Sequence, residues 1–84
     1  MSRNPAASSL LDLPRLGRAR VLAVTGDDAT AERLVILGFA PGTEVAFVRR
    51  APLAGPLVVD LRGAQICVRA SEARRILIAP MEAG

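Results

Sequence analysis

The chain has no histidine and a single cysteine, Cys67, among its 84 residues. Without histidine, neither a zinc-type cluster nor a Ser/His/Asp or Cys/His catalytic arrangement can be assembled within one chain. A lone cysteine also excludes an internal disulfide, which is typical of a reducing compartment. The sequence therefore predicts no enzymatic activity, no cofactor and no metal site.

Aromatic residues are scarce as well, because the chain has two phenylalanines, no tyrosine and no tryptophan. Barrels that bind single-stranded nucleic acid stack bases on aromatic side chains, and grooves for proline-rich peptides are lined by aromatic rings. All 11 basic residues are arginine and the net charge is +3, but the arginines are dispersed and acidic residues lie between them. These features argue against nucleic acid as the partner, for which salt-sensitive affinity would be the sign.

Long apolar runs are missing too, since none approaches the roughly 18 residues that a membrane span needs. The segment 1–9 lacks the apolar core of a signal peptide, so we expect a cytoplasmic protein without direct membrane insertion. Yet apolar residues make up 51% of the chain and its mean hydropathy is +0.36. This content is high for one small domain and indicates that some apolar side chains stay exposed for a partner.

The ends of the chain differ in composition from its middle. Residues 1–9 are rich in Ser, Ala and Pro without periodicity, which predicts a disordered tail, and residues 81–84 form a second tail. The folded domain should therefore span residues 10–80. Within it, Pro14 interrupts the leucines from Leu10 to Leu16, so we predict a short extended segment that packs them on the core.

The middle of the chain contains one helix signal. A strand over 18–24 alternates small apolar and larger residues and ends at Gly26. Asp27 or Asp28 can then accept the free backbone N–H groups of a helix over 29–37. Leu34 and Leu37 lie one turn apart on its inner face, and Gly38 follows where a left-handed cap is needed.

Short strands separated by turns fill the rest. The segment 40–43, Ala-Pro-Gly-Thr, predicts a type II turn into a strand over 44–50, and the loop 51–56 follows. Strands over 57–61 and 64–69 are predicted to form a hairpin around Arg62-Gly63. Ser71 is predicted to cap a single helical turn, and Pro80 to end a last strand over 76–78. This order predicts a mainly β fold: a small antiparallel β-barrel, closed or nearly closed, with one short α-helix after the first strand.

Two features have a chemical and a structural interpretation. The carboxylates of Asp27, Asp28 and Glu32 could hold a hard cation, but helix capping and ordinary surface charge explain them better. Cys67, in a predicted inner strand, is interpreted as a small buried hydrophobic residue rather than a redox or ferrous-iron site.

The outer face of the helix is unexpectedly apolar. Ile36 lies about 200° around the helix from Leu34, so it should be exposed, with Val35 at the border. Either neighbouring loops cover these side chains, or they form a contact patch for a partner or a second copy. Our hypothesis is that Ile36 and Val35 anchor an interface.

Several linked motifs also carry a family resemblance. Arg33-Leu34, Leu37-Gly38-Phe39, Pro41-Gly42-Thr43, Ala51-Pro52-Leu53 and Arg62-Gly63 occur in the order and spacing of the FeoA family of ferrous iron transport proteins. The segment 13–78 resembles that family. The resemblance implies an SH3-like β-barrel that acts as an accessory module of FeoB, the membrane ferrous iron transporter with a GTP-binding domain. It carries over no catalytic residue and no iron site.

The functional hypothesis is thus a cytoplasmic regulatory module that binds the cytoplasmic part of FeoB. Two alternatives remain: a metal-dependent regulator, because similar domains occur at the carboxyl end of iron-dependent repressors, and an arginine-rich nucleic-acid binder, which ranks last. Whether the module activates transport, alters GTP hydrolysis or holds an assembly together stays open, as does homo-oligomerisation. The predicted partner-binding residues are Arg33, Val35, Ile36, Pro52 and Leu53.

Overall fold

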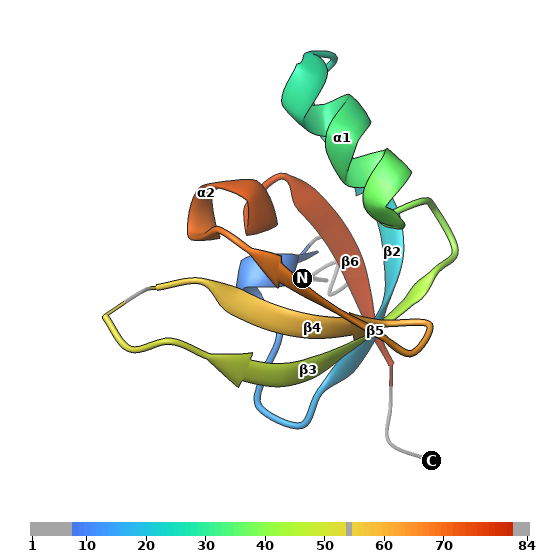
Figure 1. Ribbon diagram of the computed structural model, residues 1–84. Coiled ribbons are helices and arrows are strands. Elements are labelled where there is room, and N and C mark those ends of the chain that lie inside the picture. The colour runs from blue at the N-terminus through green and yellow to red at the C-terminus, as the bar shows by residue number, and fades with distance from the viewer. Residues whose placement is uncertain (1–7, 54, 82–84) are drawn as a thin grey trace, which may run out of the picture.

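The computed structural model describes residues 8–53 and 55–81. Six antiparallel strands form a curved sheet in the order β1-β6-β2-β3-β4-β5, with α1 at one end (Figure 1). The elements, in chain order, are β1 (Ser8–Ser9), the 3-10 helix η2 (Leu10–Asp12), β2 (Arg18–Val24), α1 (Ala29–Leu37), β3 (Glu44–Arg50), β4 (Leu57–Leu61), β5 (Ala64–Val68), α2 (Ala70–Ala73) and β6 (Ile76–Met81).

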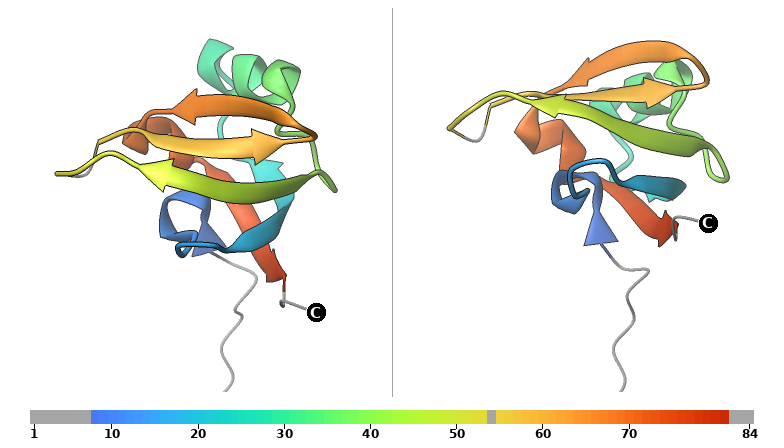
Figure 2. Two further views of the ribbon diagram at one scale, coloured as in Figure 1. Left: turned by 60° about the horizontal axis from the view of Figure 1, so that its bottom comes forward. Right: turned by 90° about the horizontal axis from the view of Figure 1, so that it is seen from below.

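The sheet curls around the core without a hydrogen-bonded closing pair. Within the described residues β1 and β5 are the two outer strands, each with one neighbour, and Figure 2 shows the curved sheet from two sides. Alternate side chains of the strands point inward, as period-two patterning requires. The buried core includes Leu10, Leu13, Ala19, Val21, Leu34, Phe39, Val45, Leu57, Val59, Leu61, Val68, Ile76 and Ile78.

Helix α1 has the predicted bounds, because local signals fix both of its ends. The backbone N–H of Ala31 donates to Asp28 Oδ1 at 3.3 Å, which caps the amino terminus. At the other end Gly38 has φ +131°, and the N–H of Phe39 donates to the Leu34 carbonyl at 3.1 Å. This is a Schellman motif, and it leaves the Phe39 side chain fully buried beyond the helix end.

The two predicted tight turns are also confirmed. The N–H of Thr43 donates to the Ala40 carbonyl at 3.1 Å, and Gly42 has the positive φ of a type II turn. Arg62 and Gly63 both have positive φ, as a type I′ hairpin turn requires. Their turn is further held by the Gly63 N–H, which donates to Asp60 Oδ1 at 2.9 Å.

The amino-terminal segment departs from the prediction. Residues Leu10–Asp12 form a 3-10 helix rather than an extended segment, since Pro14 lies beyond the helix and does not interrupt it. Leu10 and Leu13 are buried as expected, but Leu16 is 90% exposed. Ser8 and Ser9 pair with β6, in contrast to the predicted tail over residues 1–9. Residues 1–7 lie outside the described residues.

The carboxyl-terminal segment differs from the prediction in two places. Arg69, not Ser71, is the residue before α2, and its backbone N–H donates to the Glu72 carboxylate at 3.0 Å. Strand β6 continues through Pro80 to Met81, beyond the predicted end of the strand and into the predicted tail. The described part of β1 pairs only with Leu77 and Ile78 of β6, and proline is tolerated where a strand lacks a neighbour. Residues 82–84 lie outside the described residues.

Two side chains that we predicted to be inside are exposed. Cys67 is exposed because it pairs with Val58 on the outer face of the sheet, whereas the buried Leu57 and Val59 occupy the alternate positions of β4. Leu37 is also exposed, at 42%, although Leu34 in the same turn of α1 is fully buried.

Candidate protein-binding surface

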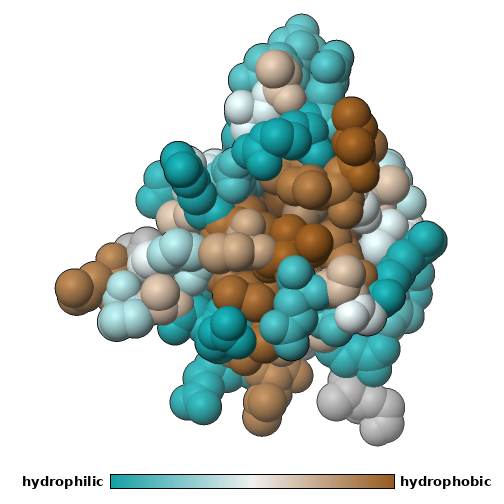
Figure 3. All heavy atoms as spheres, viewed as in Figure 1, coloured by the Kyte–Doolittle hydropathy of each residue, from teal (hydrophilic) through white to brown (hydrophobic). Residues whose placement is uncertain are grey.

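The outer side of α1 carries exposed apolar side chains. Ile36 is 82% exposed and Val35 is 42% exposed, so the predicted exposure of Ile36 is confirmed and no loop among the described residues covers it. Both residues line a shallow groove with Val24 at the end of β2, and the lining also includes Asp27 and Glu32. We name Val24, Val35 and Ile36 the α1 patch. Figure 3 shows apolar atoms on the surface beside the carboxyl-terminal half of α1.

Arg33 lies on a different side of α1, facing α2. Its guanidinium forms an ion pair with Glu72, whose side chain is only 14% exposed. The Glu72 carboxylate also accepts the backbone N–H of Arg69; this hydrogen bond, followed by the contact with Arg33, holds the pKa of Glu72 below its usual range. Arg33 therefore fastens α1 to α2, which is a structural role for a predicted partner-binding residue.

The start of α1 is fastened in a similar way. The Asp28 carboxylate accepts a hydrogen bond from the Arg75 guanidinium as well as from Ala31 N–H, and these contacts, the one with Arg75 first, lower the pKa of Asp28. The same ion pair raises the pKa of Arg75. The Arg75 carbonyl also accepts the Thr25 N–H at 2.7 Å. Arg75 therefore binds both Thr25 and Asp28, the residues at the two ends of the turn that precedes α1.

These contacts give Asp28 a structural role. Asp28 is a helix cap and an ion-pair partner, as the structural interpretation predicts. Across residues 8–53 and 55–81, no group of three or more His, Cys, Asp or Glu side chains is arranged to hold a metal ion. The same part of the chain contains no helix long and apolar enough to cross a membrane.

Pro52 and Leu53 lie apart from the α1 patch. Both are exposed at the tip of the β3–β4 loop, where Leu53 is 98% exposed and has φ +61°. The loop is closed by the Ala51 N–H, which donates to the Pro56 carbonyl at 2.9 Å. Figures 1 and 2 show this loop projecting from one side of the sheet, away from α1. The structure therefore does not bring the five predicted residues into one surface.

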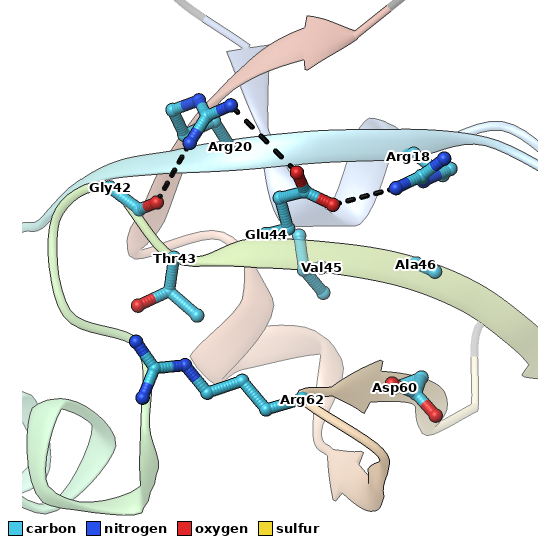
Figure 4. A pocket seen from close by; sticks show the side chains of 9 residues that line it. All are labelled: Arg18, Arg20, Gly42, Thr43, Glu44, Val45, Ala46, Asp60 and Arg62. Atoms are coloured by element: carbon cyan, nitrogen blue, oxygen red, sulfur yellow. Dashed lines mark hydrogen bonds and ion pairs between the residues drawn. The ribbon is translucent and has the colours of Figure 1, made fainter. Parts of the chain in front are cut away.

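An arginine-rich pocket lies on another side of the barrel, between β2, β3 and the β4–β5 turn (Figure 4). Arg18 forms an ion pair with Glu44 at 2.6 Å, and Arg20 donates to the Gly42 carbonyl at 3.0 Å. Arg62 extends toward Thr43 from the opposite wall in Figure 4. Two of the three arginines are thus occupied by groups of the protein itself.

The lowered pKa values of Asp28 and Glu72 predict a loss of stability in acid. Each carboxylate has a lower pKa in the folded than in the unfolded chain, so its stabilisation is present above the unfolded-state pKa, about 4. It disappears as the pH falls through the folded-state pKa. We expect urea unfolding between pH 7 and pH 3 to show this decline, and Asp28→Asn or Glu72→Gln to flatten it.

A matched control is Asp27→Asn, since Asp27 has no hydrogen-bond or ion-pair partner among the described residues. This variant should keep the wild-type slope of unfolding free energy against pH. If all three variants changed the slope equally, the two ion pairs would not be the cause of the acid sensitivity.

Comparisons with known proteins identify the family to which this fold belongs. The family model described as FeoA domain matches residues 8–80. The zinc complex of Stenotrophomonas maltophilia FeoA, described as an SH3 domain protein, is 37% identical and has a TM-score of 0.76; the match covers 86% of this chain and 89% of that one. FeoA from Chlorobium tepidum is 31% identical over 88% of this chain and 70% of its own, with a TM-score of 0.80. No curated protein sequence matches the chain.

The same fold also occurs in a larger regulator. A manganese-dependent transcriptional repressor has a TM-score of 0.80 over 96% of this chain and 45% of its own, but at 16% identity this similarity shows the fold alone. The family model spans nearly all the described residues, and the six strands and α1 match the SH3-like architecture of its members. The chain therefore belongs to the FeoA domain family of small SH3-like proteins related to iron transport.

Proposed function

We propose that this chain is an accessory protein-binding module of a FeoB-type ferrous iron transporter and that the α1 patch contacts the cytoplasmic part of that partner. The observation that carries the proposal is the exposure of Ile36 and Val35 on a helix that is fixed at both ends. Burying Ile36 against a partner would remove its apolar surface from water, which favours association. The rigid helix limits the conformational entropy lost on binding.

The surroundings of the patch support binding rather than catalysis. The groove at Val24, Val35 and Ile36 is shallow and apolar, with the carboxylates of Asp27 and Glu32 among its lining. An apolar anchor surrounded by charged groups is the usual anatomy of a protein interface. A partner segment with an apolar side chain flanked by basic residues would complement this surface. The sequence has no histidine to serve as a general base here.

The proposal predicts that Ile36→Glu greatly weakens binding to FeoB. A glutamate at the centre of an apolar contact would bury an unpaired charge, and loss of a hot-spot residue costs about 2 kcal/mol or more, which is roughly a 30-fold change in Kd. The measurement is a titration of this chain against purified FeoB, both full length and as its isolated cytoplasmic GTP-binding part. Several nucleotide and salt conditions should be included.

Leu16→Glu is the matched control, because Leu16 is similarly exposed but lies outside the α1 patch. It should leave Kd unchanged. Leu53→Glu tests separately whether the β3–β4 loop contributes. Sedimentation of the free chain and of Ile36→Glu shows whether a second copy covers the patch. Wild-type affinity in Ile36→Glu, or no binding of the chain to either form of FeoB, would refute the proposed contact.

A further inference from the structure

Among residues 8–53 and 55–81, strand β5 is an edge of the sheet that no further strand covers. Leu61 and Ala64 close the two-residue hairpin turn, and hydrogen-bonded and non-hydrogen-bonded pairs alternate from there along an antiparallel pair. The backbone N–H and C=O groups of Gln65 and Cys67 consequently point away from β4. Edge strands are usually protected by charged residues, proline or a bulge, but Ala64–Val68 contains none of these. The edge is therefore a template for a further strand.

A basic groove lies along the outer part of β5. Cys67 lines it together with Arg33 of α1, Arg75 before β6, and Arg69 just after β5, and Glu72 is the acidic residue in its lining. Arg33 pairs with Glu72 and Arg75 pairs with Asp28. Arg69 is exposed and has no ion-pair partner within the described residues. The groove thus has excess positive charge beside open backbone groups.

We propose that β5 binds an extended acidic segment of a partner protein as an additional antiparallel strand. The backbone of that segment would pair with Gln65 and Cys67, and its alternate carboxylates would face the guanidinium of Arg69 and the neighbouring groove. In strand addition the main-chain hydrogen bonds supply affinity, while alternate side chains supply specificity. The inference goes beyond the proposed function, because it concerns a different surface from the α1 patch.

A second copy of this chain fits the edge less well. Antiparallel pairing of two β5 strands about Ile66 would place Arg69 of each copy close to Arg62 of the other, because these residues flank the strand at its two ends. Like charges on opposite strands destabilise pairing, and the chain has a net charge of +3. Charge complementarity therefore favours an acidic occupant.

The test uses a short blocked peptide in which glutamate alternates with threonine and valine, titrated into the full chain and followed by backbone amide NMR. We expect the Gln65 and Cys67 amide signals to shift and their hydrogen exchange to slow. Replacing each glutamate of the peptide by glutamine should weaken binding by about tenfold, and added salt should weaken binding of the glutamate peptide. Equal binding of the two peptides, or shifts confined to other residues, would overturn the proposal.

Two variants locate the contact independently. Cys67→Pro removes one outward N–H at an edge position, where proline is tolerated, and should abolish the amide-detected binding. Arg69→Glu leaves the backbone unchanged and should reduce affinity for the glutamate peptide by about tenfold or more. Arg15→Glu changes the net charge equally but lies outside the groove, so it should bind as wild type. If Arg15→Glu and Arg69→Glu lost affinity for the glutamate peptide equally, the net charge of the chain would explain the binding, and a site at β5 would be refuted.

The peptide experiment at β5 and the FeoB titration at the α1 patch can fail separately. If Ile36→Glu loses FeoB binding but still binds the peptide, the result would support both the α1 patch as the FeoB contact and β5 as the peptide site. Peptide binding that disappears in Ile36→Glu but persists in Arg69→Glu would place the peptide on the α1 patch and overturn the β5 site. Free protein that already shows slow exchange at Gln65 and Cys67, in a concentration-dependent way, would identify a second copy as the occupant instead.

Discussion

Phe39→Ala should lower the free energy of unfolding by about 3–5 kcal/mol. Phe39 is fully buried directly after α1, and its backbone N–H belongs to the Schellman motif that ends the helix. Removing its ring leaves a cavity between α1 and the sheet, which the backbone around the cap cannot readily fill. A typical small domain is stable by about 5–15 kcal/mol, so this loss would be a large fraction of the total.

Urea unfolding followed by far-UV circular dichroism would measure the loss. Phe47→Ala is the matched control, since it makes the same chemical change at a side chain that is only partly buried. Its cost should be clearly smaller. Equal losses in the two variants would show that Phe39 does not hold the corner between α1 and β3.

Gly38→Ala should have the second largest effect on stability and lower the free energy of unfolding by about 1–3 kcal/mol. Gly38 has φ +131°, a conformation that side chains rarely adopt, and an added Cβ would lie 3.2 Å from Leu61 Cδ1. The side chain must either move Leu61 within the core or displace the end of α1. Displacement would also move Ile36, so the proposed binding to FeoB should weaken together with stability.

The melting temperature and amide hydrogen exchange in α1 measure this effect. Gly42→Ala is the control, because Gly42 also has positive φ but an added Cβ there meets no atom within 4 Å. It should show backbone strain without the packing penalty, and exchange in α1 should stay as in the wild type. If Gly38→Ala protected α1 as well as Gly42→Ala does, the contact with Leu61 would have no structural effect.

The contrast between these glycines shows what sequence rules describe well. The caps and turns of this chain depend on residues close together in sequence: Asp28 before α1, Gly38 after it, Pro41-Gly42 and Arg62-Gly63. Hydrogen bonds and backbone sterics within four or five residues decide such features. The exposure of Ile36 follows from the same local geometry, because helical periodicity places it opposite the buried Leu34.

The two wrong predictions about the strands have different causes. Alternation along β5 groups Cys67 with the exposed Gln65 and not with the buried Val68, so the prediction of a buried thiol neglected the period of the strand. Strand β6 continues through Pro80 because its pairing with β2 extends that far, and no residue near Pro80 in sequence reveals this pairing.

By itself the sequence determined the bounds of α1, the hairpin of β4 and β5, the mainly β class and the family. Local backbone chemistry and ordered motifs are sufficient for those conclusions. Only the tertiary structure decided that Arg33 is paired with Glu72, that the β3–β4 loop lies away from the α1 patch, and that β5 presents an open edge beside arginines. Each of these depends on segments far apart in the chain, whose meeting is set by the packing of the whole sheet around one core.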